Sequence, residues 1–548
     1  MKNIFLIFKR NFFLFLPFVF IPTLNNSNSL LSILVLSIYL LVIYFSKTEI
    51  CNFKSPISKV FLSYIVYISI HSIIFTDYSF INFIGSNTRH YGIFLYILLF
   101  LLFLFFQSFS QKRFNRVICV NLIVANILSI IGMLQLLFPD IYGYIDKIHF
   151  FDGKIFSSFL LPNFFGQYLS LSLGLGLYNK LKNSKIHKLI FVFPILALLL
   201  TRSKVAILAT IAVFLLYFYK KINFKDYIQK STLLVLPLFA MFSFQEFFHL
   251  GRSFESRIEI LKSSFSLFLD NLLGLNFYGL ESYFPKVINS THYMVEQNLD
   301  VIFDKSHNFI MDFLIIGGLP SLVFLGFVCS LLMRKIQKEP IKLLLILPVL
   351  IISLFSFFSV PSLILITLIF AIIFNYKFEP VSSRAKINFI LLTSIITIFF
   401  TSSFYGHLQF KKFQNTDDLS SLESTLFFNP TNLKANLEVL KFIKEDNLDE
   451  FYIKNKNTFS SQNFVIKRAF LKSKALRGDD IEVEIQSLIN QNPNDFKNHL
   501  LLANYYYYKK DFTKASIAFY NLKKHLDINL IQDFQHSKKY LQAFKRFE

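Results

Sequence analysis

Long apolar runs alternate with polar connections, most of them short and every second one basic, from the start of the chain to residue 404. A helix needs about 20 residues to cross the roughly 30 Å hydrocarbon core of a bilayer, and most runs approach that length. The pattern predicts thirteen spans, at residues 11–24, 29–45, 58–75, 92–106, 117–137, 161–178, 188–201, 203–219, 232–244, 309–333, 341–358, 360–376 and 387–404. We therefore expect an all-α polytopic membrane protein whose first span is an uncleaved anchor.

The basic connections predict how these spans are oriented. If the N-terminus is cytoplasmic, every second loop is basic, as the positive-inside rule requires. These loops contain Lys47 and Lys54; Lys112, Arg113 and Arg116; Lys180, Lys182, Lys185 and Lys188; Lys220, Lys221, Lys225 and Lys230; Arg334, Lys335, Lys338 and Lys342; and Lys377, Arg384 and Lys386. The alternation places the long loop 245–307 and the tail 405–548 outside the cytoplasm.

The tail differs from the rest of the chain, because amphipathic helical stretches replace the apolar runs. One window has small and large apolar residues at the spacing of a tetratricopeptide helix pair: Leu502, Ala503, Tyr506, Ala515 and Phe519. We therefore expect two domains, a polytopic membrane domain at 1–404 and a repeat-like helical domain at 405–548. An unspecified helical bundle is the alternative for the tail.

Composition excludes a soluble enzyme, because 54% of the 548 residues are hydrophobic and only 16% are charged. The 56 Lys and Arg exceed the 34 Asp and Glu, giving a net charge of +22. The excess cations of the membrane domain lie mainly in short loops, so we expect membrane lipid and not nucleic acid as a partner. The cysteines Cys51, Cys119 and Cys329 are too widely spaced for a disulfide framework or a metal-binding pair.

Three groups of polar residues at the outer ends of spans are candidates for chemistry. His307-Asn308 closes the long loop just before span 309–333, where a histidine can take a proton from a hydroxyl. Arg257 lies near the start of an amphipathic loop helix, and its planar fork suits a diphosphate. Arg202 and Lys204 place two cations in a very short outside turn, where phosphate binding would explain them. Helix capping and arginine snorkelling are the structural alternatives.

Two weaker motifs precede these groups, Arg89 with Gly92 and the Leu161-Pro162-Asn163 start of the sixth span. Taken together and in the order in which they occur along the chain, all these motifs resemble those of the O-antigen ligase and polymerase superfamily, which includes bacterial O-linked oligosaccharyltransferases. The resemblance covers about residues 85–335 and extends to four stretches: Thr201 to Ala206, Ser256-Arg257, Asp270 to Gly274 (without the family's proline) and Gly318-Leu319-Pro320-Ser321. Lys204 stands where the family has arginine, so either Lys204 or Arg202 provides the cation.

The resemblance implies a GT-C-like, inverting glycosyltransferase that takes glycan from undecaprenyl diphosphate and needs no metal or other cofactor. The implied acceptor is periplasmic: lipid A core, a growing glycan or a protein. His307 and Asn308 would be catalytic, and the diphosphate or substrate would be bound by Arg257, Lys204, Arg202, Arg89 and Asn163. The implied location is the bacterial inner membrane, with the tail in the periplasm.

Two other classes of function compete with this interpretation. A lipid-linked glycan flippase should have charged residues within its spans and internal repeats, and neither is prominent here. A membrane-anchored scaffold, with a tail that recruits envelope proteins, would leave the outside arginines and His307 unexplained.

Overall fold

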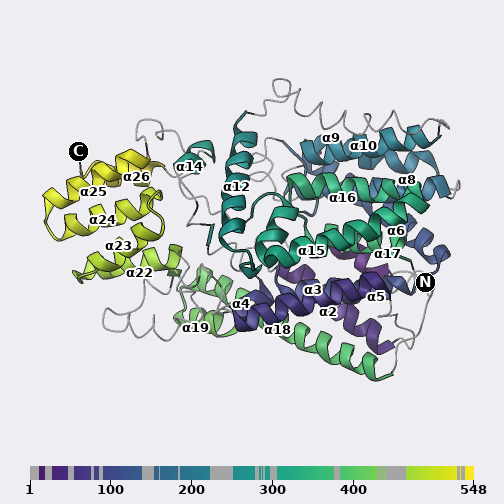
Figure 1. The fold of residues 1–548 in the computed structure, drawn as a ribbon, viewed down its shortest axis with the longest axis horizontal. Coiled ribbons are helices and arrows are strands. Elements are labelled where there is room, and N and C mark those ends of the chain that lie inside the picture. Colours follow the sequence, from purple (N-terminus) through teal and green to yellow (C-terminus); the bar gives the residue numbers. More distant parts are fainter. Residues whose placement is uncertain are drawn as a thin grey trace. The chain divides into compact units, whose positions relative to one another are not determined.

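The computed structural model is all-helical, with no strand among the residues that it describes (Figure 1). The described residues are 11–18, 28–46, 55–75, 79–85, 91–138, 153–159, 161–182, 186–221, 251–277, 283–284, 287, 290–296, 305–375, 383–429, 432, 435, 437–438, 464–526, 531 and 537–547. The chain divides into two compact units. The first comprises 1–67, 89–244 and 322–404, and the second comprises 68–88, 245–321 and 405–548.

The first unit is built around one helix that is buried on all sides. Residues Phe164 to Asn179 of α8 (Pro162–Lys182) are all buried, and this helix packs against α6, α9, α10, α16 and α17. The first unit shares three helices in part with the second unit, namely α3 (Pro56–Ile74), α15 (Phe309–Lys338) and α18 (Ser383–Thr416). Its other elements are η1 (Phe12–Phe18), α2 (Asn28–Ser46), α5 (Ile93–Gln107), α6 (Gln111–Leu137), η3 (Lys188–Phe191), α9 (Val192–Leu200), α10 (Lys204–Lys221), η4 (Pro340–Lys342), α16 (Leu343–Phe355) and α17 (Val360–Ile373).

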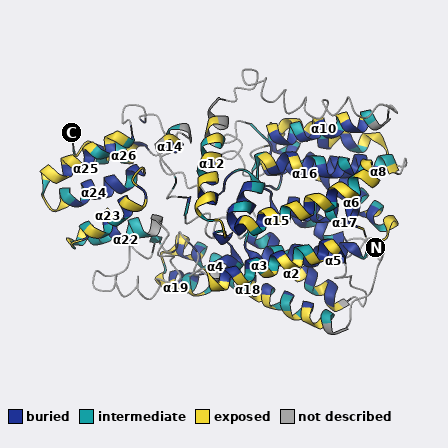
Figure 2. Cartoon of the chain, in the orientation of Figure 1, coloured by how far each residue is buried: buried dark blue, intermediate teal, exposed yellow. Residues whose placement is uncertain are grey.

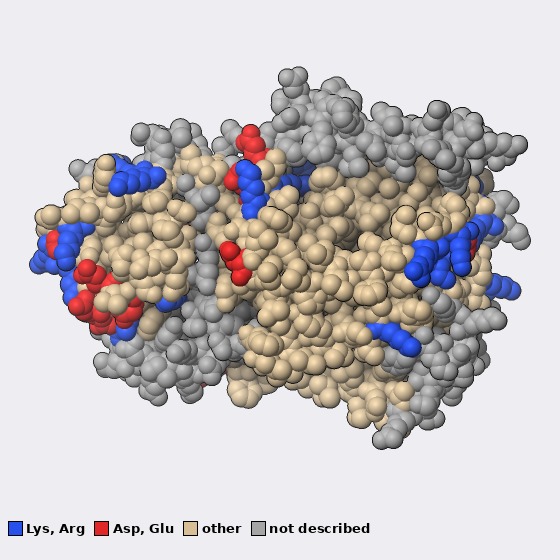
Figure 3. All heavy atoms as spheres, in the orientation of Figure 1, with Lys and Arg blue, Asp and Glu red and all other residues tan. Residues whose placement is uncertain are grey.

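Four helices are long and apolar enough to cross a membrane: α3, α6, α15 (Phe309–Lys338) and residues 385–416 of α18. Val323 and Phe327 of α15 and Ile398 of α18 are exposed, as lipid-facing side chains would be. Figure 3 shows wide areas without charged atoms. These features agree with an all-α membrane protein. The count of thirteen spans remains a prediction, and the expected span 232–244 lies outside the described residues.

The second unit contains the loop helices and the tail. Its elements are the end of α3, α4 (Ser79–Ile84), α12 (Gly251–Asp270), α14 (Ser290–Glu296), the first part of α15, the end of α18, α19 (Leu419–Phe428), α22 (Phe464–Arg477), α23 (Glu482–Gln491), α24 (Phe496–Tyr508), α25 (Phe512–His525) and α26 (Ser537–Phe544). Helices α24 and α25 pack closely, with Ala503, Ala515 and Phe519 buried (Figure 1). Assignment of this pair to the tetratricopeptide class remains a prediction.

Helix α15 is broken at Gly318, whose φ of 62° and ψ of −150° are open essentially only to glycine. In a continuous helix, the Leu319 N–H would donate to the Ile315 carbonyl. Here the Leu319 N–H donates to Leu272 O at 2.8 Å, and Ile315 O accepts from the Leu275 N–H at 2.9 Å. The turn that follows α12 therefore satisfies both groups that the break leaves without a helical partner.

Two glycines make this backbone contact possible. A Cβ on Gly318 would lie 2.1 Å from Leu272 O, and one on Gly274, whose φ is 95°, would lie 2.5 Å from Ile316 O. Both distances are far below a tolerable contact, so neither position accepts a larger residue without backbone movement. The two glycine motifs in the sequence are thus the two sides of one contact.

Asn276 anchors the same turn to the end of α3. Its Oδ1 accepts a hydrogen bond from Ser72 Oγ at 2.9 Å, and its Nδ2 lies 2.7 Å from His71 Nδ1. The residue is fully buried and has a φ of 61°, a conformation that asparagine tolerates better than most residues. The turn after α12 is therefore held by backbone bonds on one side and by side chains on the other.

We expect Gly318→Ala to destabilise the fold by about 3 kcal/mol or more, because the new methyl group collides with backbone at a glycine-only conformation. Gly326→Ala is the matched control in the same helix, since a Cβ there meets nothing within 4 Å. Relief of backbone entropy should make that control neutral or more stable by about 0.5–1 kcal/mol. Thermal unfolding of the purified variants in one detergent would compare them. Equal unfolding temperatures would contradict the contact.

Candidate functional site

The start of α15 holds the predicted His307-Asn308 pair in a dense set of local hydrogen bonds. Asn308 is the helix cap, because its Oδ1 accepts from the Met311 N–H at 3.0 Å. Ser306 Oγ donates to Asn308 O at 2.8 Å, and the Ser306 N–H donates to Asp312 Oδ1 at 2.8 Å. The backbone on both sides of His307 is therefore fixed.

His307 itself adopts a left-handed backbone conformation with φ of 55°. Such a conformation costs a non-glycine residue roughly 1–2 kcal/mol. The side chain is half-buried, and capping is already performed by its neighbour. The capping alternative therefore applies to Asn308 and does not explain the histidine.

The turn between α9 and α10 repeats this local arrangement. Arg202 has a φ of 49°, and the Ser203 N–H donates to Thr201 Oγ1 at 3.2 Å. At α15 the Asn308 N–H donates to Ser306 Oγ, also at 3.2 Å. Both helices are thus preceded by three residues of the same kind: a hydroxyl residue (Thr201 or Ser306), a residue with positive φ (Arg202 or His307) and a polar residue (Ser203 or Asn308).

The turn also lies against the start of α8, where Asn163 is found. A Cβ on Gly166 would lie 2.8 Å from Ser203 Cβ and 3.1 Å from Thr201 Oγ1. Asn163 lies one helical turn before Gly166, on the same side of α8. Asn163, Arg202 and Lys204 are all exposed. The structure therefore brings the first-unit candidates to one end of α8, where an anion could reach the cations and the N-terminus of α10.

Arg257 lies in the second turn of α12 and is half-buried. This helix packs against α14, and Ser263 Oγ lies 3.1 Å from the buried His292 Nε2. Figure 2 shows that α12 has an exposed face. The large apolar side chains exposed on this helix include Ile258, Leu261, Phe265 and Leu269. An apolar face of this kind is typical of a helix in a membrane interface.

The candidate residues are divided between the two units, and one of them lies outside the described residues. Arg257, His307 and Asn308 belong to the second unit, whereas Asn163, Arg202 and Lys204 belong to the first. Arg89 lies outside the described residues. No group of three His, Cys, Asp or Glu that could hold a metal occurs in the part of the chain that the structure describes.

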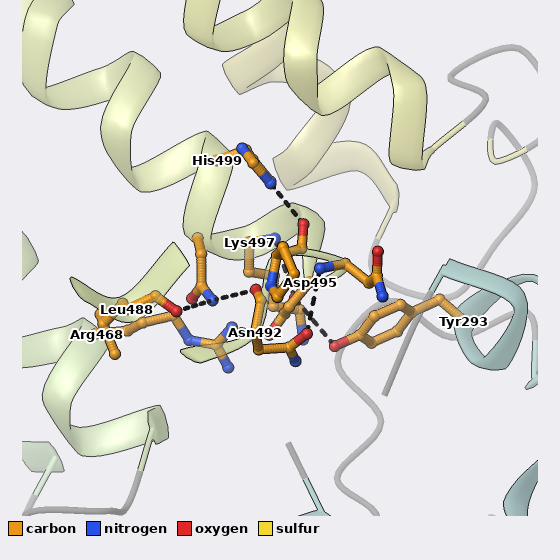
Figure 4. A network of polar contacts seen from close by, with 10 residues as sticks. Tyr293, Arg468, Leu488, Asn492, Asp495, Lys497 and His499 are labelled. Carbon is orange, nitrogen blue, oxygen red and sulfur yellow. Dashed lines mark hydrogen bonds and ion pairs between the residues drawn. The ribbon is translucent and has the colours of Figure 1, made fainter. Parts of the chain in front are cut away.

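A polar cluster within the second unit joins the loop to the tail (Figure 4). Asp495, which caps α24 by accepting from the Lys497 N–H at 3.1 Å, forms an ion pair with Arg468 of α22. The Tyr293 hydroxyl of α14 donates to Asp495 Oδ1 at 3.3 Å. Burial and then the Asp495 carboxylate raise the pKa of Tyr293 well above its ordinary value, so this hydroxyl stays a donor.

Aromatic contacts surround this loop-to-tail cluster of Tyr293, Arg468 and Asp495. The Tyr293 ring meets the Phe496 ring edge to face at 5.1 Å, and Lys497 Nζ lies 4.8 Å from the Tyr293 centroid. Tyr293 is only 2% exposed. The tail is thus joined through a buried, directional contact to the loop that precedes His307.

Sequence reasoning missed two features of this region. In the loop-to-tail cluster, Tyr293 and Asp495 are 202 positions apart in the sequence. A local sequence pattern cannot predict a contact between residues so far apart. The sequence around Lys305 is polar and gives no sign of burial, yet the residue is only 7% exposed. The Asp495-Phe496 step, an N-cap before an amphipathic run, was the only local signal for the cluster.

Residues 189–326 match the family model described as O-Antigen ligase. The matched segment contains the turn at Thr201, Arg257, His307-Asn308 and the glycine break of α15, and it confirms the predicted resemblance to that superfamily. The match indicates a glycan-transferring membrane enzyme. Arg89 and Asn163 lie outside it. No curated protein and no solved structure matches the chain.

We expect Asp495→Ala to destabilise the second unit by about 3–5 kcal/mol, because Arg468 would keep its burial and lose its counter-ion. Asp495→Asn should lose less, since an amide can still cap α24. The exposed pair of Lys514 and Glu482, 3.8 Å apart, provides the control, and Lys514→Ala should change stability by less than about 1 kcal/mol.

Thermal unfolding of the full chain, combined with protease cleavage between α14 and α22, would measure these effects. Unchanged unfolding and cleavage in Asp495→Ala would show that the cluster does not hold the loop to the tail.

Proposed function

We propose that the chain is an inverting, metal-independent glycosyltransferase of the bacterial inner membrane that transfers glycan from undecaprenyl diphosphate to a periplasmic acceptor. The observation that carries this proposal is the O-Antigen ligase match at 189–326, which contains His307, Arg257 and the Arg202–Lys204 turn. The lipid-like exposure of α15 and α18 supports a membrane location.

In the proposed reaction, His307 accepts the proton of the acceptor hydroxyl. The acceptor oxygen forms a bond to the anomeric carbon while the bond from that carbon to the phosphate oxygen breaks. The electron pair of the broken bond stays on the diphosphate, and attack from the opposite side inverts the anomeric centre. Positioned proton transfer of this kind typically contributes about a hundredfold to ten-thousandfold in rate.

The cations stabilise the charge that develops on the departing diphosphate. Arg257 offers a forked donor, Lys204 or Arg202 offers a second cation, and Arg89 is a further candidate. Electrostatic stabilisation of developing charge is usually the largest catalytic contribution, and these residues need no metal to supply it. Asn308, whose Oδ1 caps α15, would hold His307 in position and bind the sugar, and Asn163 would bind substrate beside the Thr201 turn.

The acceptor is lipid A core, a growing polysaccharide or a protein side chain. The tail is proposed to lie in the periplasm as a tetratricopeptide-like domain, and its contact through Tyr293 and Asp495 supports a role close to the reaction loop. Repeat domains bind many kinds of ligand, so the tail alone does not select among these acceptors.

A lipid-linked glycan flippase is the second candidate function, and a membrane-anchored scaffold is the third. Neither requires a base held at a strained backbone position. The left-handed conformation of His307, fixed by hydrogen bonds on both sides, favours the enzyme.

We expect Arg257→Ala to lower transfer from purified undecaprenyl diphosphate glycan by about tenfold or more, since a charge-assisted bond to phosphate is lost. Arg257→Lys should also be impaired, because the planar fork is lost. Lys262→Ala is the control on the same helix, where the exposed lysine pairs with Glu259 at 2.7 Å. Wild-type turnover in Arg257→Ala would remove this arginine from the site.

For His307, glycine is the informative replacement, because it accepts the φ of 55° without strain. We expect His307→Gly to fold with wild-type or slightly higher stability and bind donor normally, yet transfer at least about a hundredfold more slowly. His307→Ala should show the same loss of rate while keeping the backbone strain. Rate, donor affinity and unfolding temperature should be measured on each variant; a stable His307→Gly protein with normal rate would exclude the proposed base.

A further inference from the structure

Helix α12 has three different sides, and the first of them faces protein. Ile260, Ser264, Leu267 and Phe268 are buried, and the helix packs against α14. Residues three and four positions apart lie on one side of a helix, so these four form a single buried side. The Ser264 hydroxyl donates to the Ile260 carbonyl at 2.6 Å, which satisfies the polar group on this side.

The second side of α12 is apolar and exposed. Ile258, Leu261, Phe265 and Leu269 follow one another at the same helical spacing, and Leu272 continues the row in the turn after the helix. We call these five residues the apolar row. Their exposed fractions range from 37% to 54%. A single exposed leucine is ordinary, but an uninterrupted row of about four helical turns marks a surface that binds something apolar.

The third side of α12 is polar. Glu255, Lys262, Ser266 and Asp270 are exposed, and the half-buried Glu259 pairs with Lys262 at 2.7 Å. Protein, an apolar surface and a polar surface thus follow one another around the helix axis. A surface helix of a soluble domain needs only two sides, one for the core and one for water. The apolar row requires a third environment.

The end of the apolar row shows what that environment is. The Leu272 carbonyl accepts from the Leu319 N–H at 2.8 Å, and Leu319 is itself exposed. Leu319 belongs to α15, which is long and apolar enough to cross a membrane. The row therefore leads onto a helix whose exposed apolar side chains suit hydrocarbon. A lipid surface covers both parts at once.

We infer that the apolar row is a lipid-binding surface and that α12 lies in the membrane interface, where protein, hydrocarbon and water meet. Helices of this kind insert their apolar face about 5–10 Å into the boundary between headgroups and acyl chains. In the described part of the polar side, three carboxylates stand against one lysine. Apolar burial, and not attraction to anionic headgroups, therefore supplies the binding free energy.

This placement gives the proposed diphosphate residue a position relative to the lipid. Arg257 is half-buried and lies one helical turn before both Ile260 of the buried side and Leu261 of the apolar row. It is therefore at the edge where protein meets hydrocarbon. An arginine at such an edge reaches the level of the headgroups, where a lipid-linked diphosphate is also displayed.

The absence of tryptophan from the sequence allows a direct test, because one introduced tryptophan is then the only one in the chain. Phe265→Trp places the reporter in the apolar row, and Ser266→Trp places it one residue away on the polar side. Each full-length protein would be reconstituted in phosphatidylcholine vesicles that contain no glycan donor. Emission would be measured with iodide in the water and with lipids brominated near either end of the acyl chain.

The Phe265→Trp protein should emit at shorter wavelength than the Ser266→Trp protein and lose most of its emission to brominated lipid. Bromine near the glycerol end should quench it more than bromine near the methyl end, since the helix is interfacial. Iodide should quench Ser266→Trp strongly and Phe265→Trp little. Added phosphatidylglycerol should leave these differences unchanged, because the binding does not depend on anionic headgroups.

Three results would overturn the inference. Equal quenching of both proteins by iodide would show that the apolar row faces water. Protection of Phe265→Trp from iodide and from both brominated lipids would show that protein, such as a second copy of the chain, covers the row. Stronger quenching by the deeper bromine would place α12 within the hydrocarbon and not at its edge.

Two features keep the test decisive. Leu261→Trp is a second reporter in the apolar row, so a misfolded Phe265→Trp protein would not end the experiment. Because the vesicles contain no donor, the quenching depends on lipid contact alone. The lipid-binding surface can therefore fail while the proposed transfer reaction stands, and the reverse also holds.

Discussion

The close approach of two backbones at Gly274 and Gly318 determines how the region around the candidate site residues Arg257 and His307 is built. A helix broken in a largely apolar protein leaves a carbonyl and an N–H that must find partners. The turn after α12 provides both, through Leu272 O and the Leu275 N–H. The end of the helix that bears Arg257 is thereby tied to the helix that follows His307. Because the tie is made of backbone atoms, it does not depend on side-chain rotamers.

This contact shows what local sequence analysis can and cannot predict. It predicted the helices and the two glycine motifs, but it did not predict that the two motifs lie against each other. Apolar runs predict helices because their length and composition are local properties, and the described runs are helical. The glycines at 274 and 318 were recognised as two separate motifs. Nothing in either stretch states that Gly274 faces the carbonyl of Ile316, since that distance is set by the packing of segments some forty residues apart.

Burial was the other property that the sequence could not supply. The span at 161–178 looked like its neighbours, yet α8 is enclosed by protein, whereas α15 and α18 expose apolar side chains. Hydropathy measures aversion to water and does not distinguish lipid from protein interior. The same limit applies to Lys305 and Asp495, two charged residues whose neighbours in the sequence give no sign of burial. Among the predicted site residues in the described chain, Asn163, Arg202, Lys204, His307 and Asn308 lie at helix starts or in turns, and Arg257 lies in the second turn of α12. Their role in binding a substrate stays a prediction.

The two strained turns provide the strongest link between local structure and chemistry. Thr201-Arg202-Ser203 and Ser306-His307-Asn308 share a hydroxyl that accepts the N–H two residues later and a central residue with positive φ. Glycine would adopt the positive φ of Arg202 or of His307 without strain, so backbone conformation does not explain why arginine and histidine stand at these positions. Each central residue lies two positions before the first residue of a helix, Lys204 of α10 or Phe309 of α15, and the N–H groups at a helix start favour an anion. The strain is thus borne by side chains able to hold a phosphate or move a proton, and it is offset by the hydrogen bonds that fix the backbone around them.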